Sequence, residues 1–149
     1  VLVRGDPKTQ DARTNFQLLA DLPVPIITMD GMEEGALEQG DMPDVLVDAM
    51  FGTGFHGVMR GNALKAAEYI NNCHEKHGKK VFALDIPSGL GGDQLKKKKI
   101  SCEIIKADYT ITFHARKPVH MRRFAACYCG EILVADIGID EEKLMTVEI

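Results

Sequence analysis

Short apolar runs alternate along this chain with longer stretches in which apolar residues recur at helical spacing. Short runs rich in β-branched residues predict strands, and Tyr109–Phe113 follows the same pattern. The run Asp44–Met50 is almost continuously apolar, which is typical of a parallel strand buried on both faces. The complete set of predicted strands is Val1–Val3, Val24–Thr28, Asp44–Met50, Val81–Asp85, Tyr109–Phe113 and Glu131–Ile137.

Two stretches carry helical spacing. Behind Asp11, a candidate N-cap, the apolar residues Ala12, Phe16 and Leu19 predict a first helix. A second helix is predicted from Asn62, as N-cap, to the terminating Gly78. Its expected buried face consists of Ala63, Ala66, Ala67, Ile70 and Cys73. The Gly-, Glu- and Asp-rich segment 30–41 is predicted to be a loop with at most one helical turn.

Strands that alternate with helices predict an α/β fold with a mostly parallel sheet covered by helices on both faces. At 149 residues the chain is long enough for one domain, spanning 1–149. In such a sheet the ligand site lies beyond the carboxyl ends of the strands. Residues that follow strands are therefore the first candidates for chemistry.

Composition excludes several classes of protein. Hydrophobic residues make up 45% and charged residues 27%, as in globular proteins, and no apolar run is long enough to span a bilayer. The net charge of −4 argues against nucleic acid as a partner, and we interpret the lysine run Lys96–Lys99 as a solvated loop rather than a phosphate or RNA contact. Four irregularly spaced cysteines indicate thiols in a reducing compartment.

A glycine-rich string, Gly52-Thr53-Gly54-Phe55-His56-Gly57, follows the predicted strand that ends at Met50. Glycines at this spacing let the backbone turn sharply and approach a diphosphate, which backbone N–H groups then bind. In the usual fingerprint the last glycine opens the helix, whereas here 58–61 intervene. A glycine-rich connection that only turns the chain explains the string about equally well.

Three charged side chains lie at or beyond the ends of predicted strands. Asp85, in Asp-Ile-Pro-Ser-Gly, is a candidate general acid or base, or else a turn aspartate. Asp48 interrupts an apolar strand, where it either binds backbone N–H groups or, with Ser88, supplies hard oxygen ligands to an alkali or alkaline-earth cation. Lys117 is a candidate acid or phosphate contact, with a surface lysine as the alternative.

Four motifs in sequence order resemble the YjeF N-terminal domain family, the NAD(P)H-hydrate epimerases. They are Asp-Val-Leu-Val-Asp-Ala-Met-Phe-Gly-Thr-Gly (44–54), Ala-Leu-Asp-Ile-Pro-Ser-Gly-Leu (83–90), Ala-Asp-Tyr-Thr-Ile-Thr-Phe with Lys117-Pro118, and Gly-Glu-Ile-Leu-Val-Ala-Asp-Ile-Gly-Ile (130–139). The resemblance implies a three-layer α/β/α Rossmann-like sandwich that interconverts the R and S epimers of hydrated NADH or NADPH (NADHX and NADPHX). It further implies a homodimer, a fused or separate dehydratase as partner, and a cytoplasmic location, or a mitochondrial one in a eukaryote.

The resemblance also implies roles for individual residues. Asp48 and Ser88 would bind a potassium ion, and Asp85 and Lys117 would be catalytic, with Asp85 also contacting the hydrated nicotinamide. The loop that would hold the substrate's phosphates consists of Gly52, Thr53, Gly54, Phe55, His56, Gly57 and Val58.

The chain departs from the family pattern at three places. The family's first strand and its Asn-Asn-Gly-Gly-Asp-Gly loop, which supply phosphate contacts and another potassium ligand, should precede Val1, so we expect an N-terminally truncated domain. Gly91 stands where the family usually has Asp, and Val119 where it has Gly. Both positions bear on contacts with the substrate.

Two other functions compete with the epimerase. One is a non-catalytic YjeF-like scaffold for dimerisation and for binding RNA or protein, which the lysine run and the missing loop would suit. Such scaffolds tend to lose the acidic site, whereas this chain keeps Asp48, Asp85, Ser88 and Lys117. The other is an NAD(P)-dependent dehydrogenase, which the mid-chain glycine string and the lack of hydride-transfer residues disfavour.

Overall fold

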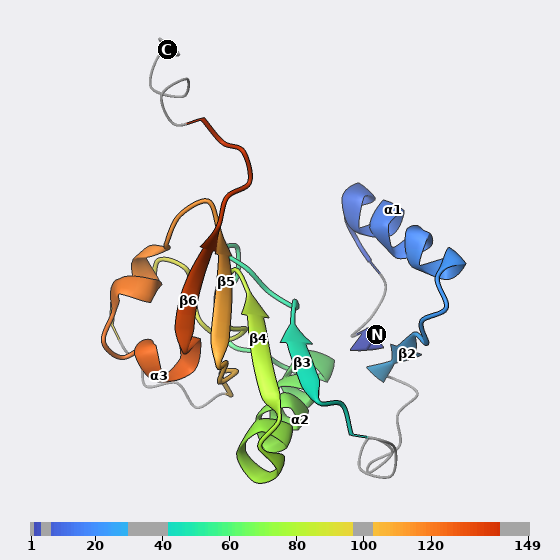
Figure 1. Ribbon diagram of the computed structural model, residues 1–149, viewed down its shortest axis with the longest axis horizontal. Coiled ribbons are helices and arrows are strands. Elements are labelled where there is room, and N and C mark those ends of the chain that lie inside the picture. Colours follow the sequence, from blue (N-terminus) through green and yellow to red (C-terminus); the bar gives the residue numbers. More distant parts are fainter. Residues whose placement is uncertain (1, 4–6, 30–41, 97–102, 141–149) are drawn as a thin grey trace.

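The computed structural model describes residues 2–3, 7–29, 42–96 and 103–140. Its central feature is a four-stranded sheet in the order β3-β4-β5-β6, made of Val45–Asp48, Lys80–Leu84, Tyr109–Phe113 and Glu131–Ala135 (Figure 1). All three strand pairs are parallel. The predicted α/β class with a parallel, Rossmann-like sheet is thereby confirmed. The predicted loop 30–41 and most of the lysine run, 97–99, lie outside the described residues.

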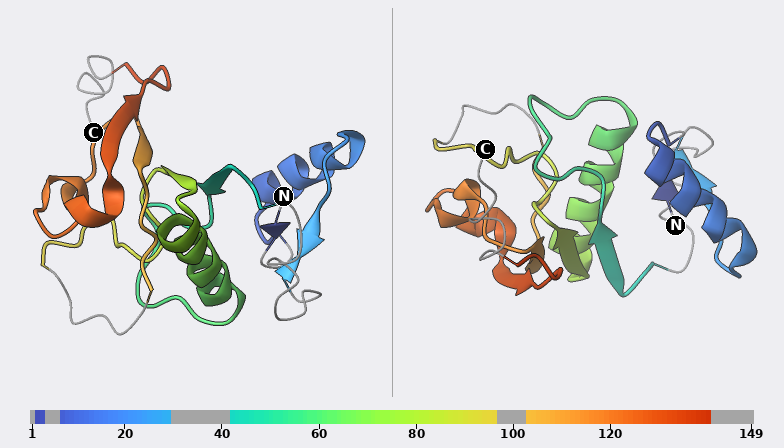
Figure 2. Two further views of the ribbon diagram at one scale, coloured as in Figure 1. Left: turned by 60° about the horizontal axis from the view of Figure 1, so that its bottom comes forward. Right: turned by 90° about the horizontal axis from the view of Figure 1, so that it is seen from above.

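A smaller unit lies beyond the β3 edge of this sheet in Figures 1 and 2. Strands β1 (Leu2–Val3) and β2 (Ile27–Thr28) pair in parallel, and α1 (Gln10–Leu18) with a short 3₁₀ helix (Leu19–Asp21) connects them. The N-cap of α1 is Thr9, whose side chain accepts a hydrogen bond from the Ala12 N–H at 3.2 Å. The predicted cap Asp11 was wrong, because Thr9 already has the extended backbone that a cap needs and Asp11 lies within the first turn.

Helix α2 (Asn62–His77) packs its small and apolar residues on the sheet. All five residues of the predicted face are buried, together with Leu46, Val81 and Ala83 of the strands beneath. The predicted end of the helix is confirmed, since Gly78 adopts the left-handed conformation and its N–H donates to the His74 carbonyl at 3.1 Å. Its start differs from the prediction by one residue, because Gly61 is the N-cap and Asn62 the first helical residue.

A second apolar cluster lies over β5 and β6, around the 3₁₀ helix Pro118–Met121 and α3 (Ala126–Cys129). Its buried residues are Ile86, Leu90, Ile104, Val119, Ala125 and Cys129. The buried Thr110 hydroxyl of β5 ties α3 to the sheet by donating to the Cys129 carbonyl at 2.7 Å. Because Thr110 is in register with Ala83, which packs under α2, both helices cover the same face.

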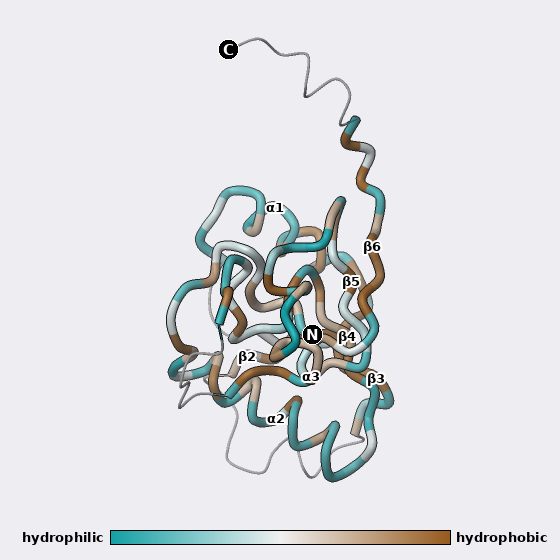
Figure 3. Tube along the Cα trace, turned by 90° about the vertical axis from the view of Figure 1, so that its left-hand side faces the viewer, coloured by the Kyte–Doolittle hydropathy of each residue, from teal (hydrophilic) through white to brown (hydrophobic). Residues whose placement is uncertain are grey.

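The opposite face of the sheet exposes apolar side chains. Along β3, Leu46 and Asp48 are buried, whereas Val45 and Val47 are 50% and 57% exposed. The expectation of a strand buried on both faces was therefore wrong for β3 within the described residues. Figure 3 shows how the hydrophobic residues concentrate along the strands, while polar and apolar residues alternate along α2. Within the described ranges, no helix is both long and apolar enough to cross a membrane.

Candidate functional site at the carboxyl ends of the strands

The parallel register brings the carboxyl ends of β3, β4 and β5 to one edge of the sheet. Asp48 is paired with Ala83, and Leu84 with Ile111, so the loops that follow these strands begin side by side. These are the loops that contain the glycine-rich string, Asp85 to Ser88, and Lys117. The sequence prediction that the candidate residues converge at this edge is confirmed by their contacts.

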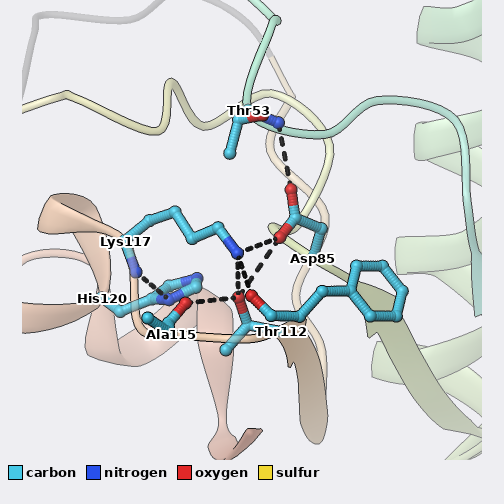
Figure 4. Close-up of polar contacts among 7 residues, drawn as sticks. Thr53, Asp85, Thr112, Ala115, Lys117 and His120 are labelled. Atoms are coloured by element: carbon cyan, nitrogen blue, oxygen red, sulfur yellow. Dashed lines mark hydrogen bonds and ion pairs between the residues drawn. The ribbon is translucent and has the colours of Figure 1, made fainter. Parts of the chain in front are cut away.

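Asp85 follows β4 in a left-handed conformation, with φ of 68°. This is an uncommon backbone for a residue with a side chain, and such strain concentrates at functional sites. Its N–H donates to the Ile111 carbonyl at 2.7 Å, which fixes the turn against β5. The side chain is only 14% exposed and points toward the loop after β3 and toward Lys117 (Figure 4).

Lys117 forms the ion pair of the site. Its Nζ lies 2.7 Å from Asp85 Oδ1 and also donates to the Thr112 hydroxyl at 2.9 Å and the Phe113 carbonyl at 2.8 Å (Figure 4). An ammonium has three N–H donors, so these contacts use all of them. With 19% of its side chain exposed, Lys117 is not the surface lysine that the sequence left as an alternative.

The carboxylate of Asp85 is held on both oxygens. Oδ2 accepts from the Thr53 N–H at 3.1 Å, and the Thr112 hydroxyl lies 3.2 Å from Oδ1. Burial by itself would raise the pKa of Asp85, but the hydrogen bond and charge of Lys117, aided by Thr53 and Thr112, outweigh it and hold the pKa below its usual value. Asp85 is therefore an ionised carboxylate at neutral pH, with acceptor capacity left on Oδ2.

His120 contacts the backbone of Lys117. Its Nδ1 accepts the backbone N–H of Lys117 at 3.1 Å, which leaves the ring proton on Nε2 if the ring is neutral (Figure 4). Burial, followed by the nearby charge of Lys117, lowers the pKa of His120 and favours this neutral form. Nε2 is buried without a hydrogen-bond partner among the described residues.

Asp48 and Ser88 form a second, buried centre. Asp48 Oδ1 accepts from the Ser88 hydroxyl at 2.7 Å and the Met50 N–H at 3.3 Å, and Oδ2 accepts from the Ser88 N–H at 2.7 Å. Each residue is 1% exposed. Burial is the largest influence and raises the pKa of Asp48, although these hydrogen bonds partly offset it.

The donor set of this second centre fits an alkali cation in its chemistry. Asp48 has no ion-pair partner within the described ranges, and the remaining lone pairs of Asp48 and Ser88 are hard oxygen donors. Among the same residues no group of three or more His, Cys, Asp or Glu side chains is placed to hold a metal ion. The backbone-bonded aspartate and the cation ligand, posed as alternatives by the sequence, are compatible in this geometry.

The glycine-rich loop is bound to the β4 loop at two points. The Phe51 N–H donates to Ser88 Oγ at 3.1 Å, and the Thr53 N–H donates to Asp85. Gly52 lies between them, and a Cβ there would stand 3.0 Å from Asp85 Oδ2, so this close approach favours glycine. Most of the predicted phosphate loop is exposed at the surface, namely Thr53, Gly54, His56, Gly57 and Val58.

Sequence reasoning missed two polar contributors to this site. Thr112 bridges Asp85 and Lys117, and its signal was a second inward-facing threonine in the alternating strand β5. His120 follows Lys117 by three residues, the spacing at which a side chain can cap the start of a helix. Neither signal reveals a link to Asp85 before the fold is known.

Comparisons with known proteins place this site in context. Residues 1–119 match the family described as YjeF-related protein N-terminus. The bifunctional NAD(P)H-hydrate repair enzyme Nnr of Archaeoglobus fulgidus is 36% identical over 141 residues, which are 95% of this chain and 27% of that protein. The NAD(P)H-hydrate epimerases of Nitrosopumilus maritimus and Cenarchaeum symbiosum are 32% and 30% identical over 95% of this chain, or 61% and 62% of those proteins.

This chain thus spans about a quarter of the bifunctional relative and less than two thirds of either epimerase. The family match nevertheless covers most of its residues, including Asp48, Asp85, Ser88 and Lys117. The chain belongs to the family of YjeF-related protein N-termini.

Proposed function

We propose that this protein is an NAD(P)H-hydrate epimerase, an isomerase that interconverts the R and S epimers of NADHX and NADPHX. The observation that carries the proposal is the ion pair of Asp85 and Lys117, 2.7 Å long, fixed beside the glycine-rich loop. Relatives that bear the epimerase name and share about a third of its residues support the same reaction class. The intact Asp85–Lys117 pair favours catalysis over the scaffold function.

The reaction that this site supports is loss and return of water at C6 of the hydrated ring. The ring nitrogen's lone pair forms a C=N bond as the C–O bond breaks, and the departing hydroxide takes a proton and leaves as water. Water then adds to the other face and gives up a proton, so atoms and charge balance. The proton that the departing hydroxide takes comes from solvent. Ionised Asp85 is suited to accept the proton of the returning water on Oδ2 and then to release it to solvent, which regenerates the carboxylate.

The other residues orient this carboxylate. Lys117 has all three N–H donors engaged and stabilises the charge of Asp85. The Thr112 hydroxyl contacts both side chains and holds them next to each other. Most residues of the glycine-rich loop 52–58 are exposed. The N–H groups of Thr53 and Phe55 already donate within the protein, so the other backbone N–H groups of the loop would bind the substrate's diphosphate. This assignment places the hydrated ring at Asp85 and the phosphates along the loop that Thr53 anchors.

A potassium ion at Asp48 and Ser88 is part of the proposal. Their oxygens would hold it, and when bound the ion would supply positive charge beneath the diphosphate loop. The support is a buried carboxylate whose pKa is raised and which lacks a cation among the described residues. We also propose a homodimer, for which the exposed apolar residues of β3 and β6 offer surface, and a fused or separate dehydratase as partner.

We further propose a reducing compartment, the cytoplasm. The described cysteines Cys73, Cys127 and Cys129 are free thiols, which is consistent with that setting.

The test is epimerisation of purified (R)-NADHX by the intact protein, followed by chromatographic separation of the epimers. Asp85→Asn keeps the size of the side chain but removes the base, and should slow the reaction by ~10²–10⁴-fold. Asp44→Asn is the matched control, since Asp44 is exposed and pairs with Lys79 at a distance from the site. Full activity of Asp85→Asn would refute the assignment, and a folded wild type without activity would refute the function.

The same assay, together with a measurement of stability, tests whether potassium binds at Asp48 and Ser88. Potassium should support turnover and raise the free energy of unfolding, whereas sodium at equal ionic strength should do so less. At ten times its dissociation constant a single ion stabilises the fold by about 1.4 kcal/mol. Asp48→Asn should abolish the difference between the two salts. Equal behaviour of the wild type in both salts would overturn the potassium site while leaving the epimerase proposal intact.

A further inference from the structure

A pocket is lined by the later part of the glycine-rich loop, and Asp85 is not among its lining residues. It has a volume of about 420 Å³, within the range of small-molecule sites. Its walls come from two segments, Phe55–Gly57 of the glycine-rich loop and Gly91–Lys96 of the loop after β4. The proposed function uses the first of these segments for the diphosphate and gives the second no role.

The two walls are built differently. On one side the Phe55 ring packs against Phe51, with centroids 4.6 Å apart, so an aromatic surface is held in place. On the other side Gln94 braces a turn, because its Oε1 accepts from the Gly91 N–H at 3.3 Å and its Nε2 donates to the Lys96 carbonyl at 3.2 Å. The turn places Asp93 and Lys96, both exposed, at the pocket.

The direction of the loop decides which part of a dinucleotide reaches this pocket. Thr53 is bonded to Asp85, at the reacting end, and Phe55 to Gly57 lie farther along the same loop. The proposed function, on which this inference rests, requires the diphosphate to lie along the loop. The group beyond the diphosphate is then the adenosine half of the substrate. A partly buried aromatic ring and a space of this size suit an adenine base and its ribose.

We infer that this pocket binds the adenosine half of the substrate and that Lys96 gives it a preference for a ribose 2′-phosphate, hence for NADPHX over NADHX. Lys96 has no ion-pair partner among the described residues and is the first of four consecutive lysines in the sequence. Asp93 acts in the opposite direction, because a carboxylate accepts a hydrogen bond from a ribose 2′-hydroxyl and repels a phosphate. The inference requires that the charge-assisted contact between Lys96 and the phosphate outweigh both the repulsion by Asp93 and the hydrogen bond that Asp93 would make with a hydroxyl.

Fragment binding tests the pocket without any turnover. In the intact protein at about 0.15 M salt, adenosine 2′,5′-bisphosphate should bind about tenfold more tightly than adenosine 5′-monophosphate, as expected for one added charge-assisted contact. Lys96→Ala should remove most of this ratio, and Asp93→Asn should increase it severalfold. Lys65→Ala, which removes the same charge from an exposed position on α2, is the matched control and should leave the ratio unchanged.

Equal loss of the ratio in Lys96→Ala and Lys65→Ala would overturn the inference, since general charge would then explain it. Equal affinity of the two fragments for the wild type would also overturn it. Kinetics separate this outcome from failure of the proposed function. Epimerisation of both substrates with a kcat/KM ratio insensitive to Lys96→Ala refutes the pocket's role alone, whereas absence of epimerisation with selective fragment binding refutes only the function.

Discussion

Two aspartates at the ends of neighbouring strands have opposite electrostatic surroundings. Asp85, after β4, is paired with Lys117, and its pKa is lowered despite partial burial. Asp48, at the end of β3, is fully buried, is bonded only to neutral donors among the described residues, and has a raised pKa. Under the proposed function, the first carboxylate would accept a proton and the second would hold a cation.

This difference follows from what the neighbouring strand supplies. The loop after β5 brings an ammonium to Asp85, whereas Asp48 receives the N–H and hydroxyl of Ser88. Neutral donors stabilise a buried carboxylate less than a cation does, so the negative charge of Asp48 is only partly stabilised. The comparison can be tested by removing each partner in turn.

The largest effect is expected from removing the cation of the first centre. Lys117→Met keeps much of the side chain's length but leaves Asp85 partly buried without its ion pair, so the pKa of Asp85 should rise. Epimerisation should slow by about 10²-fold, because Asp85 loses the ion pair that fixes its position. The steady-state rate with (R)-NADHX measures the loss, and titration of Asp85 by NMR measures the pKa.

Lys79→Met is the matched control for that variant. Lys79 pairs with the exposed Asp44 across 3.1 Å, so the same change there removes an ion pair from the surface. It should leave the rate unchanged. A Lys117→Met protein that is folded, fully active and unchanged in the pKa of Asp85 would contradict the role given to the ion pair.

The second effect concerns the buried centre and is measured in stability. Asp48→Ala leaves the Ser88 hydroxyl and two backbone N–H groups without their acceptor, which should cost about 2–3 kcal/mol of unfolding free energy. Urea denaturation of Asp48→Ala, Ser88→Ala and the double variant measures the coupling between the two residues. Additive losses would show that the two side chains do not act as a unit.

Sequence could predict the elements of this site but not their mutual contacts. The strand ends at Asp48 and Asp85 follow from apolar runs and breaker residues, which are local signals. The bonds from Thr53 to Asp85 and from Phe51 to Ser88 join segments more than thirty residues apart, and only the register of β3 and β4 brings them together. The exposed face of β3 was likewise beyond prediction, because periodicity shows that a strand is apolar and not what covers it.

A third prediction compares two glycines of the same loop. Gly52→Ala would place a Cβ 3.0 Å from Asp85 Oδ2, and because Lys117 and Thr112 hold that carboxylate, the clash should cost about 1 kcal/mol. Gly54→Ala meets no atom within 4 Å and should leave the fold's stability nearly unchanged. Urea denaturation without substrate measures both, and equal losses would show that contact with Asp85 is not what restricts Gly52.

The smallest effect is in the pH dependence of stability, because the two centres act in opposite directions. Asp85 has a folded pKa below its unfolded value, so it contributes stability above the unfolded pKa that is lost as the pH falls through the folded pKa. Asp48 has a folded pKa above its unfolded value, so its contribution is greatest below the unfolded pKa and declines as the pH rises through the folded one. In the wild type the two slopes therefore lie in adjacent pH ranges that meet at the ordinary aspartate pKa of 3.8.

Neutralising each residue should separate the two slopes. In potassium-free buffer, Asp48→Asn should remove the decline in stability that Asp48 causes above the ordinary aspartate pKa of 3.8. Asp85→Asn should instead reduce the rise in stability with pH below 3.8, to which Asp108 also contributes. Urea denaturation at each pH gives both curves. If both variants kept the wild-type slope, the opposite surroundings of the two aspartates would have no thermodynamic consequence, and the buried centre would have no electrostatic reason to bind a cation.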